Sequence, residues 1–246
     1  KPDYGRAWNN KGNLLFSIAR TDEALECFDR ALKLDPNYEK AWNNKGNILL
    51  TRNQTDAALQ CFDRALELDP KYEKAWNNKG SALFNLGKIE ESLECFRKAL
   101  TLKKDYDKAW YNAGAALHKM GKSEEAIACF DKAIQLKPKY DEAWYNKGAA
   151  LFKIGKVKES IECFNETIRL NPKFDEAWYN LGSAEFYLGN PLAALKAIDT
   201  ALEINPDYDD AKRIKAEIVT AKSLEAVGGH AAASAALLVI VDPDVP

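Results

Sequence analysis

The sequence has few of the residues on which catalytic and metal sites usually depend. Its two histidines, His118 and His230, lie far apart, and its five cysteines form no closely spaced C-x-x-C pair. We find no Ser/His/Asp or Cys/His arrangement and no glycine-rich phosphate loop in the pattern of residues. We therefore expect a protein that is not an enzyme and that needs no cofactor and no metal ion.

An excess of charge and a long apolar run are also missing. The 35 basic and 37 acidic side chains leave a net charge of −2, so no general field attracts nucleic acid or an anionic membrane. The longest apolar stretch, residues 231–241, is far shorter than the roughly 20 residues that span a bilayer. The composition, 46% hydrophobic and 29% charged, is typical of a soluble, folded chain, for which we expect a cytoplasmic location.

Repetition is what the sequence has in abundance. A tryptophan recurs every 34 residues, followed four residues later by a glycine, and a large apolar residue of the same period follows each pair. The tryptophans are Trp8, Trp42, Trp76, Trp110, Trp144 and Trp178, and the large apolar residues are Phe28, Phe62, Phe96, Phe130, Phe164 and Ile198. A fixed period of this length indicates stacked structural repeats.

Each repeat is predicted to contain two amphipathic helices. Small or apolar residues follow the spacing i, i+4, i+7 twice, at Trp8, Gly12 and Leu15 and again at Ala24, Phe28 and Ala31. Glycines that favour a left-handed helix end separate the two helices at Gly87, Gly121, Gly155 and Gly189. Thr21, Thr55 and Ser123 are predicted N-caps of second helices, and Pro191 suits a first helical turn. Prolines such as Pro36 end the repeats, and Lys104 takes that place once.

This pattern resembles the signature of the tetratricopeptide repeat family, which is a tryptophan, then Leu-Gly, a large apolar residue, alanine, an aromatic, alanine and proline. The resemblance covers six repeats, at residues 5–38, 39–72, 73–106, 107–140, 141–174 and 175–208. It implies an all-α, right-handed superhelical solenoid of helix-turn-helix repeats. It also implies a protein that binds other proteins through a concave groove.

The two ends of the sequence depart from the repeat. Residues 1–4 read like residues 205–208, the close of a repeat, so we interpret them as the remnant of a preceding one. Residues 209–227 keep helical spacing without the tryptophan and are predicted to form a capping helix. The apolar tail, residues 228–246, has three alternatives. It docks in the groove of its own or a neighbouring molecule, forms a second capping helix, or is an artificial and unstructured extension.

The resemblance places the groove on positions 2, 5, 6, 9, 12 and 13 of each first helix, counting Gly5 as position 1. Position 6 is asparagine in every repeat: Asn10, Asn44, Asn78, Asn112, Asn146 and Asn180. Asparagine is a mediocre residue inside a helix, and its amide pairs with any peptide backbone, so we predict that this ladder binds an extended peptide. The alternatives are bonds between neighbouring repeats and a trace of recent duplication.

The other groove positions change character midway along the chain. Position 5 runs from Asn9, Asn43 and Asn77 to Tyr111, Tyr145 and Tyr179, and position 9 begins with Asn13 and Asn47. Position 2 has Arg6, Lys40, Lys74 and Lys108, followed by Glu142 and Glu176. Position 12 includes Phe84 and Phe152. The early part is predicted to favour acidic ligand segments and the late part apolar or aromatic ones. A solvated charged face without a ligand is the alternative.

The sequence therefore favours a scaffold or adaptor that holds an extended segment of a partner protein. A targeting arm of a larger enzyme and a solenoid that associates with itself, for instance through the tail, are the alternatives. The cysteines recur with the repeat at Cys27, Cys61, Cys95, Cys129 and Cys163. Stacked helices about 8 to 10 Å apart hold them too far apart for disulfides, so we expect small buried residues.

Overall fold

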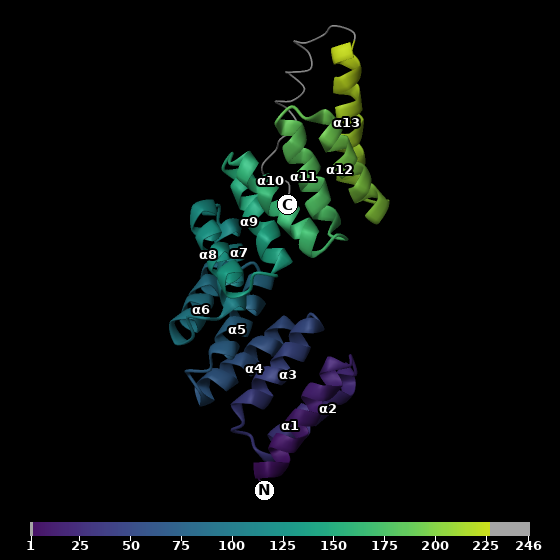
Figure 1. Cartoon of the computed structure of the whole chain (residues 1–246). Coiled ribbons are helices and arrows are strands. Elements are labelled where there is room, and N and C mark those ends of the chain that lie inside the picture. Colours follow the sequence, from purple (N-terminus) through teal and green to yellow (C-terminus); the bar gives the residue numbers. More distant parts are fainter. Residues whose placement is uncertain (1, 227–246) are drawn as a thin grey trace. The chain divides into compact units, whose positions relative to one another are not determined.

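A computed structural model describes residues 2–226. Within this range the chain forms thirteen α-helices and no β-strand (Figure 1). The helices are α1 (Pro2–Ser17), α2 (Thr21–Leu34), α3 (Glu39–Thr51), α4 (Thr55–Leu68), α5 (Glu73–Asn85), α6 (Ile89–Leu102), α7 (Asp107–Lys119), α8 (Ser123–Leu136), α9 (Asp141–Lys153), α10 (Val157–Leu170), α11 (Asp175–Tyr187), α12 (Pro191–Ile204) and α13 (Asp209–Ala226). The all-α prediction is confirmed. Residue 1 and residues 227–246, with the predicted tail, lie outside the described residues.

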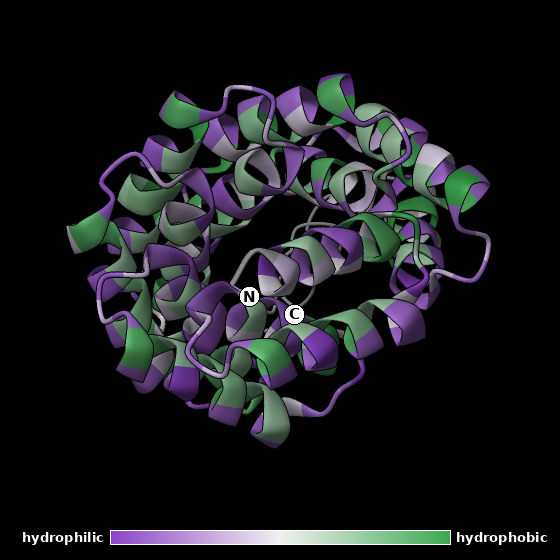
Figure 2. Ribbon diagram, turned by 90° about the horizontal axis from the view of Figure 1, so that it is seen from below, coloured by the Kyte–Doolittle hydropathy of each residue, from purple (hydrophilic) through white to green (hydrophobic). Residues whose placement is uncertain are grey.

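The chain divides into two compact units, an N-terminal unit (Lys1–Gly121) and a C-terminal unit (Lys122–Pro246). In the N-terminal unit, the hairpins α1/α2, α3/α4 and α5/α6 are followed by α7, and α1, α3, α5 and α7 contact one another in sequence. In the C-terminal unit, α8 precedes the hairpins α9/α10 and α11/α12, and α13 follows. Hydrophilic and hydrophobic residues alternate along the helices, as amphipathic packing requires (Figure 2).

A large side chain of the second helix packs against a glycine of the first within each described hairpin. Phe28 is 1% exposed, and a Cβ atom added to Gly12 would lie 2.6 Å from its Cε1 atom. The same close approach joins Gly46 to Phe62, Gly80 to Phe96 and Gly148 to Phe164. The sixth repeat substitutes Ile198 against Gly182. The conserved spacing of glycine and aromatic therefore sets how closely the two helices pack.

The turn between the two helices requires one residue with a left-handed backbone. Gly87, Gly121, Gly155 and Gly189 have φ between +74° and +79°, as predicted. Ala19 and Asn53 occupy the same place in the first two repeats, with φ of +59° and +58°. A side chain at such an angle is costly for alanine and tolerated by asparagine.

The predicted N-caps are wrong by one residue. Thr21 and Thr55 are the first residues of α2 and α4, and the caps are Arg20 and Gln54, which make no side-chain capping bond. The turn explains this, because the Arg20 N–H donates to the carbonyl oxygen of Leu15, the bond that closes the preceding helix. Arg20 thus closes the end of α1 and is also the N-cap of α2. Ser123, the first residue of α8, is displaced in the same way, whereas Pro191 begins α12 as expected.

A tryptophan indole binds the turn that precedes its own helix. Trp42 Nε1 donates to the carbonyl oxygen of Pro36 over 2.9 Å. The same bond recurs from Trp76 to Pro70, from Trp110 to Lys104, from Trp144 to Pro138 and from Trp178 to Pro172. Since the acceptor is a backbone carbonyl, Lys104 replaces proline without changing the bond.

Helix α13 packs on the last hairpin. Its Ile214 and Ile218 are buried against Phe186, Ala194 and Ile198. At the other end, α1 includes residues 2–4, which are helical, whereas the corresponding residues 36–38 before α3 lie outside any helix.

Candidate functional site

The candidate site consists of one face of the first helices, described separately in each unit. The N-terminal face comprises Lys40, Asn44, Asn47, Lys74 and Asn78, and the C-terminal face comprises Glu142, Asn146, Phe152, Glu176, Asn180 and Tyr187. These side chains are half-buried or exposed. Arg6, Asn10, Asn13 and Lys108 are also exposed, and Phe84 is half-buried. The helical period of 3.6 residues places positions 2, 6, 9 and 13 on one broad side of each helix.

In the N-terminal unit, a ladder of amide hydrogen bonds joins successive repeats. Asn44 Nδ2 donates to Asn9 Oδ1 over 2.9 Å. The bond recurs from Asn78 to Asn43 over 2.9 Å and from Asn112 to Asn77 over 3.0 Å. The donor always comes from position 6 of one repeat and the acceptor from position 5 of the repeat before. Bonds between neighbouring repeats, which were one alternative for the ladder, are therefore present at these residues.

The position-5 asparagines do not belong to the predicted groove. Asn9, Asn43 and Asn77 are 3%, 2% and 5% exposed, so a ligand cannot reach their side chains. Adjacent helical residues point about 100° apart, which turns position 5 toward the neighbouring hairpin while position 6 stays at the surface. Sequence reasoning missed this because both positions carry the same residue.

The position-6 asparagines keep part of their amide at the surface. Asn44, Asn78 and Asn112 are half-buried. Each has two N–H donors and a carbonyl oxygen, and the cross-repeat bond uses one donor. Asn112 Nδ2 also donates to Ser81 Oγ over 3.4 Å. Asn44 Oδ1 also faces the Nδ2 atom of Asn43 at 3.4 Å. These bonds fix the orientation of the amide.

In the C-terminal unit, a tyrosine replaces the buried asparagine as acceptor. Asn180 Nδ2 donates to the hydroxyl oxygen of Tyr145 over 2.9 Å, and the Tyr145 ring stacks on Phe174 with centroids 4.9 Å apart. Burial raises the pKa of Tyr145 to about 12. The rings of Tyr179 and Tyr208 lie tilted against each other with centroids 4.9 Å apart. Each ring therefore packs against the aromatic residue that ends its own repeat, and Tyr111 is likewise half-buried. Asn146 Nδ2 donates to the carbonyl oxygen of Glu142 over 2.9 Å.

A second set of contacts between repeats was not predicted. Lys45 Nζ lies 2.7 Å from Asp29 Oδ1, and the pair recurs as Lys79 with Asp63, Lys147 with Asp131 and Lys215 with Asp199. Where the lysine is lost, at Ala113 and Leu181, the residue sixteen positions earlier is no longer aspartate but Arg97 or Asn165. This paired loss was a signal in the sequence, but it has meaning only once the stacking of the hairpins is known.

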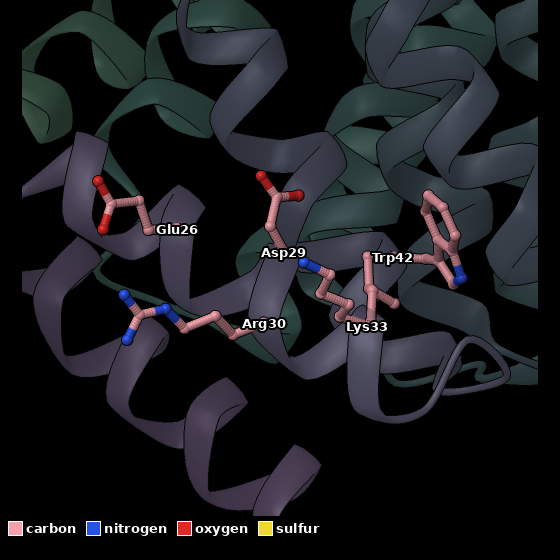
Figure 3. Close-up of a pocket in the computed structure, with 6 residues that line it drawn as sticks. Glu26, Asp29, Arg30, Lys33 and Trp42 are labelled. Carbon is pink, nitrogen blue, oxygen red and sulfur yellow. The ribbon is translucent and has the colours of Figure 1, made fainter.

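A shallow depression of about 710 Å³ lies elsewhere in the N-terminal unit. Figure 3 shows its lining, Glu26, Asp29, Arg30 and Lys33 from α2 with Trp42 from α3, together with Leu32. It contains none of the predicted groove residues, and Asp29 is paired with Lys45. Among the described residues, no group of three or more His, Cys, Asp and Glu is arranged to hold a metal ion. The five cysteines are free thiols.

The family model for the tetratricopeptide repeat matches residues 5–38, 39–72, 107–140, 141–174 and 175–208. Two further repeat models match residues 61–94 and 80–121. The chain belongs to the tetratricopeptide repeat family. No curated protein sequence matches this tetratricopeptide chain significantly. Within residues 2–226, no helix is long and apolar enough to cross a membrane.

Solved tetratricopeptide structures resemble the chain along most of its length. One is YrrB, described as a tetratricopeptide repeat protein with an unusual peptide-binding site, at 27% identity and a TM-score of 0.65 over 78% of this chain and 98% of that one. Another is MamA, at 25% identity and a TM-score of 0.61 over 65% and 94% of the two chains. The PilF protein of Pseudomonas aeruginosa, at 17% identity and a TM-score of 0.79 over 87% and 98%, shows the fold alone.

Proposed function

We propose that the chain binds an extended segment of a partner protein across the first helices of its repeats. A tetratricopeptide fold is in general a protein-interaction scaffold, and the proposal adds the mode of binding. The peptide-binding site named for YrrB, which is 27% identical, supports this mode.

The observation that carries the proposal is the orientation of the surface amides. The cross-repeat bonds hold Asn44, Asn78 and Asn112 in one rotamer before any ligand arrives. A fixed amide loses little side-chain entropy on binding, which leaves more of the hydrogen-bond energy for affinity. With packed helices about 8 to 10 Å apart and an extended chain rising about 3.3 Å per residue, successive amides, one per repeat, match the backbone polar groups of roughly every third ligand residue. Backbone recognition of this kind tolerates different ligand side chains.

Exposed cations add a preference for acidic segments in the N-terminal unit. Lys40 and Lys74 occupy position 2 of successive repeats and are exposed, and Arg6 and Lys108 extend the row. A carboxylate that meets such a cation forms a charge-assisted hydrogen bond, which is stronger than a neutral one. The row therefore selects ligand charge, while the amides bind the backbone.

The charges provide the test, because alanine at the asparagines would also break contacts between repeats. The probe is a fluorescein-labelled decapeptide of alternating Glu and Ser, and fluorescence anisotropy measures its affinity for the full chain. Lys40→Glu with Lys74→Glu is expected to weaken binding roughly tenfold at low salt. This loss should shrink at high salt because exposed charges are screened.

The matched control is Lys33→Glu with Lys71→Glu, which changes the net charge equally at exposed residues outside the N-terminal face. We expect this control to change affinity less than about twofold. An equal loss in both double variants would mean that the peptide responds to net charge alone, and the proposed binding face would be wrong.

A further inference from the structure

Pairs of adjacent acids begin two first helices of the C-terminal unit. They are Asp141 with Glu142 in α9 and Asp175 with Glu176 in α11. Asn171 Nδ2 donates to Asp141 Oδ2 over 3.1 Å, and Asn205 Nδ2 donates to Asp175 Oδ2 over 2.7 Å. The first acid of each pair is thus held by the residue that ends the second helix of its own repeat. The second acid, Glu142 or Glu176, is exposed on the C-terminal face.

The two carboxyl groups of each pair have pKa values shifted in opposite directions. Burial opposes ionisation of Asp141, but hydrogen bonds from Glu142 and Asn171 outweigh it and hold the pKa of Asp141 below its ordinary value. Burial and the bond to Asp141 raise the pKa of Glu142, against a weaker opposing effect of Lys137. Glu176 has a raised pKa for the same two reasons, burial and its bond to Asp175. A neighbouring cation would stabilise both groups as carboxylates.

Helix α13 also begins with two adjacent acids, but each of them forms an ion pair with a basic residue. Asp209 lies 3.2 Å from Lys212, and Asp210 lies 2.8 Å from Arg213. The residue three positions after Glu142 is Tyr145, and the residue three positions after Glu176 is Tyr179. These tyrosines pack against Phe174 and Tyr208, so α9 and α11 have an aromatic ring where α13 has its arginine.

An aromatic pair lies toward the other end of the same two helices. The rings of Phe152 and Tyr187 meet edge to face with centroids 6.1 Å apart, and Tyr187 is 49% exposed. Ten residues separate Glu142 from Phe152, which corresponds to about 15 Å along the helix. Asn146 and Asn180 lie between these ends in the sequence of each helix. The C-terminal face therefore has an acidic edge, an amide centre and an aromatic edge.

An extended chain that crosses α9 and α11 along the amides would use both edges. Successive side chains of an extended chain point to opposite sides. One set then faces Glu142 and Glu176, and the alternate set faces Phe152 and Tyr187. From a backbone that lies along the amides, lysine and arginine side chains are long enough to reach the carboxylates of Glu142 and Glu176. A leucine or valine next to them in the ligand would cover the rings of Phe152 and Tyr187.

We infer that the C-terminal face binds an extended protein segment in which basic residues alternate with apolar ones. This inference rests on the proposed function and names the class of ligand for one of its two faces. The N-terminal face, with Lys40 and Lys74 at the same repeat position, prefers the opposite charge. The two units of one chain thus select differently charged segments of their partners.

The test uses three fluorescein-labelled octapeptides and the full chain. One alternates Lys and Leu, the second alternates Lys and Ser, and the third alternates Glu and Leu. We expect the Lys–Leu probe to bind the chain roughly tenfold more tightly than the Lys–Ser probe in fluorescence anisotropy. Glu142→Gln with Glu176→Gln, which preserves side-chain size, should remove about tenfold of the Lys–Leu affinity, and Tyr187→Ala should weaken the same probe severalfold.

The matched control is Glu124→Gln with Glu125→Gln, which removes two exposed carboxylates at the start of α8. It should leave the Lys–Leu affinity within about twofold. Equal losses of Lys–Leu affinity in the two double variants would overturn the inference. It would also be overturned if Glu142→Gln with Glu176→Gln weakened the Glu–Leu probe as much as the Lys–Leu probe. These outcomes do not depend on Lys40 and Lys74, whose reversal tests the proposed function with the acidic probe.

Discussion

The surface amide of Asn44 donates a hydrogen bond to the buried Oδ1 atom of Asn9, 35 residues earlier in the chain. We predict that Asn44→Ala destabilises the fold by about 1 to 3 kcal/mol, because it leaves a buried polar group of Asn9 without its partner. Urea unfolding followed by tryptophan fluorescence measures this change. In a double-mutant cycle, Asn9→Ala and Asn44→Ala should show a coupling of roughly 0.5 kcal/mol or more.

Asn13→Ala is the control for this prediction. Asn13 lies on α1 and is exposed, so its replacement should change the free energy of unfolding by less than about 0.5 kcal/mol. If Asn44→Ala were as stable as Asn13→Ala, the bond between repeats would contribute nothing to the fold.

The left-handed backbone of Ala19 predicts a stabilising substitution. Ala19→Gly removes a conformational penalty of about 1 to 2 kcal/mol and adds about 0.5 to 1 kcal/mol of unfolded-chain entropy, so a net gain of several tenths of a kcal/mol or more is expected. Gly87→Ala, at the same place in the third repeat, should destabilise by a similar amount. Opposite signs in urea unfolding would support the prediction, whereas a loss of stability in Ala19→Gly would contradict it.

The missing lysine–aspartate pair of the third and fourth repeats can be installed. Ala113→Lys alone should destabilise, because it places a lysine beside Arg97 at a site where Ala113 is 2% exposed. Adding Arg97→Asp reproduces the arrangement of Lys79 with Asp63, and should recover about 0.2 to 1 kcal/mol through the pair. Thermal unfolding of the single and double variants checks this. With Arg97→Asn in place of Arg97→Asp the recovery should be smaller, and equal recovery would show that only relief of repulsion matters.

The buried thiols are predicted to react slowly in the folded chain. Burial raises the pKa of Cys163 to about 11, so at pH 8 only about one thiol in a thousand is a thiolate. Since the thiolate is the reactive form, alkylation by iodoacetamide at pH 8 should be at least about a hundredfold slower than in urea. Mass spectrometry of the peptide containing Cys163 measures the rate, which should rise as the pH approaches the raised pKa. Equal rates in the folded and unfolded chain would show that Cys163 is accessible.

The repeat period, the helix pairs and the turn glycines are predictable from sequence because each depends on local spacing and residue type. The function of Asn9 is not predictable in this way, since its burial depends on the angle at which one hairpin stacks on the next. Asn9 and Asn10 are identical and adjacent, and only the neighbouring repeat distinguishes them. The left-handed backbone of Ala19 could not be predicted from local sequence, because alanine is a strong helix former and gives no sign of a turn.

The lysine–aspartate pairs between repeats are partly predictable from the sequence. Lys45 and Asp29 recur together and disappear together, so the sequence contains the correlation, but the distance between their side chains follows only from stacked helices. The predicted groove is in part retained, since Lys40, Asn44, Lys74 and Asn78 remain at the surface. Its binding activity stays a prediction.

The ladder of identical asparagines also bears on how such a gene changes length. If recombination removed residues 39–72 as a block, Asn78 would meet Asn9 as Asn44 does now, and Lys79 would meet Asp29. Removing residues 73–106 would bring Asn112 to Asn43 but set Ala113 against Asp63, which loses its lysine. Removal of an early repeat by unequal crossing-over would thus preserve the contacts between its neighbours. The fourth repeat differs, because Ala113 is matched to Arg97 of the third repeat.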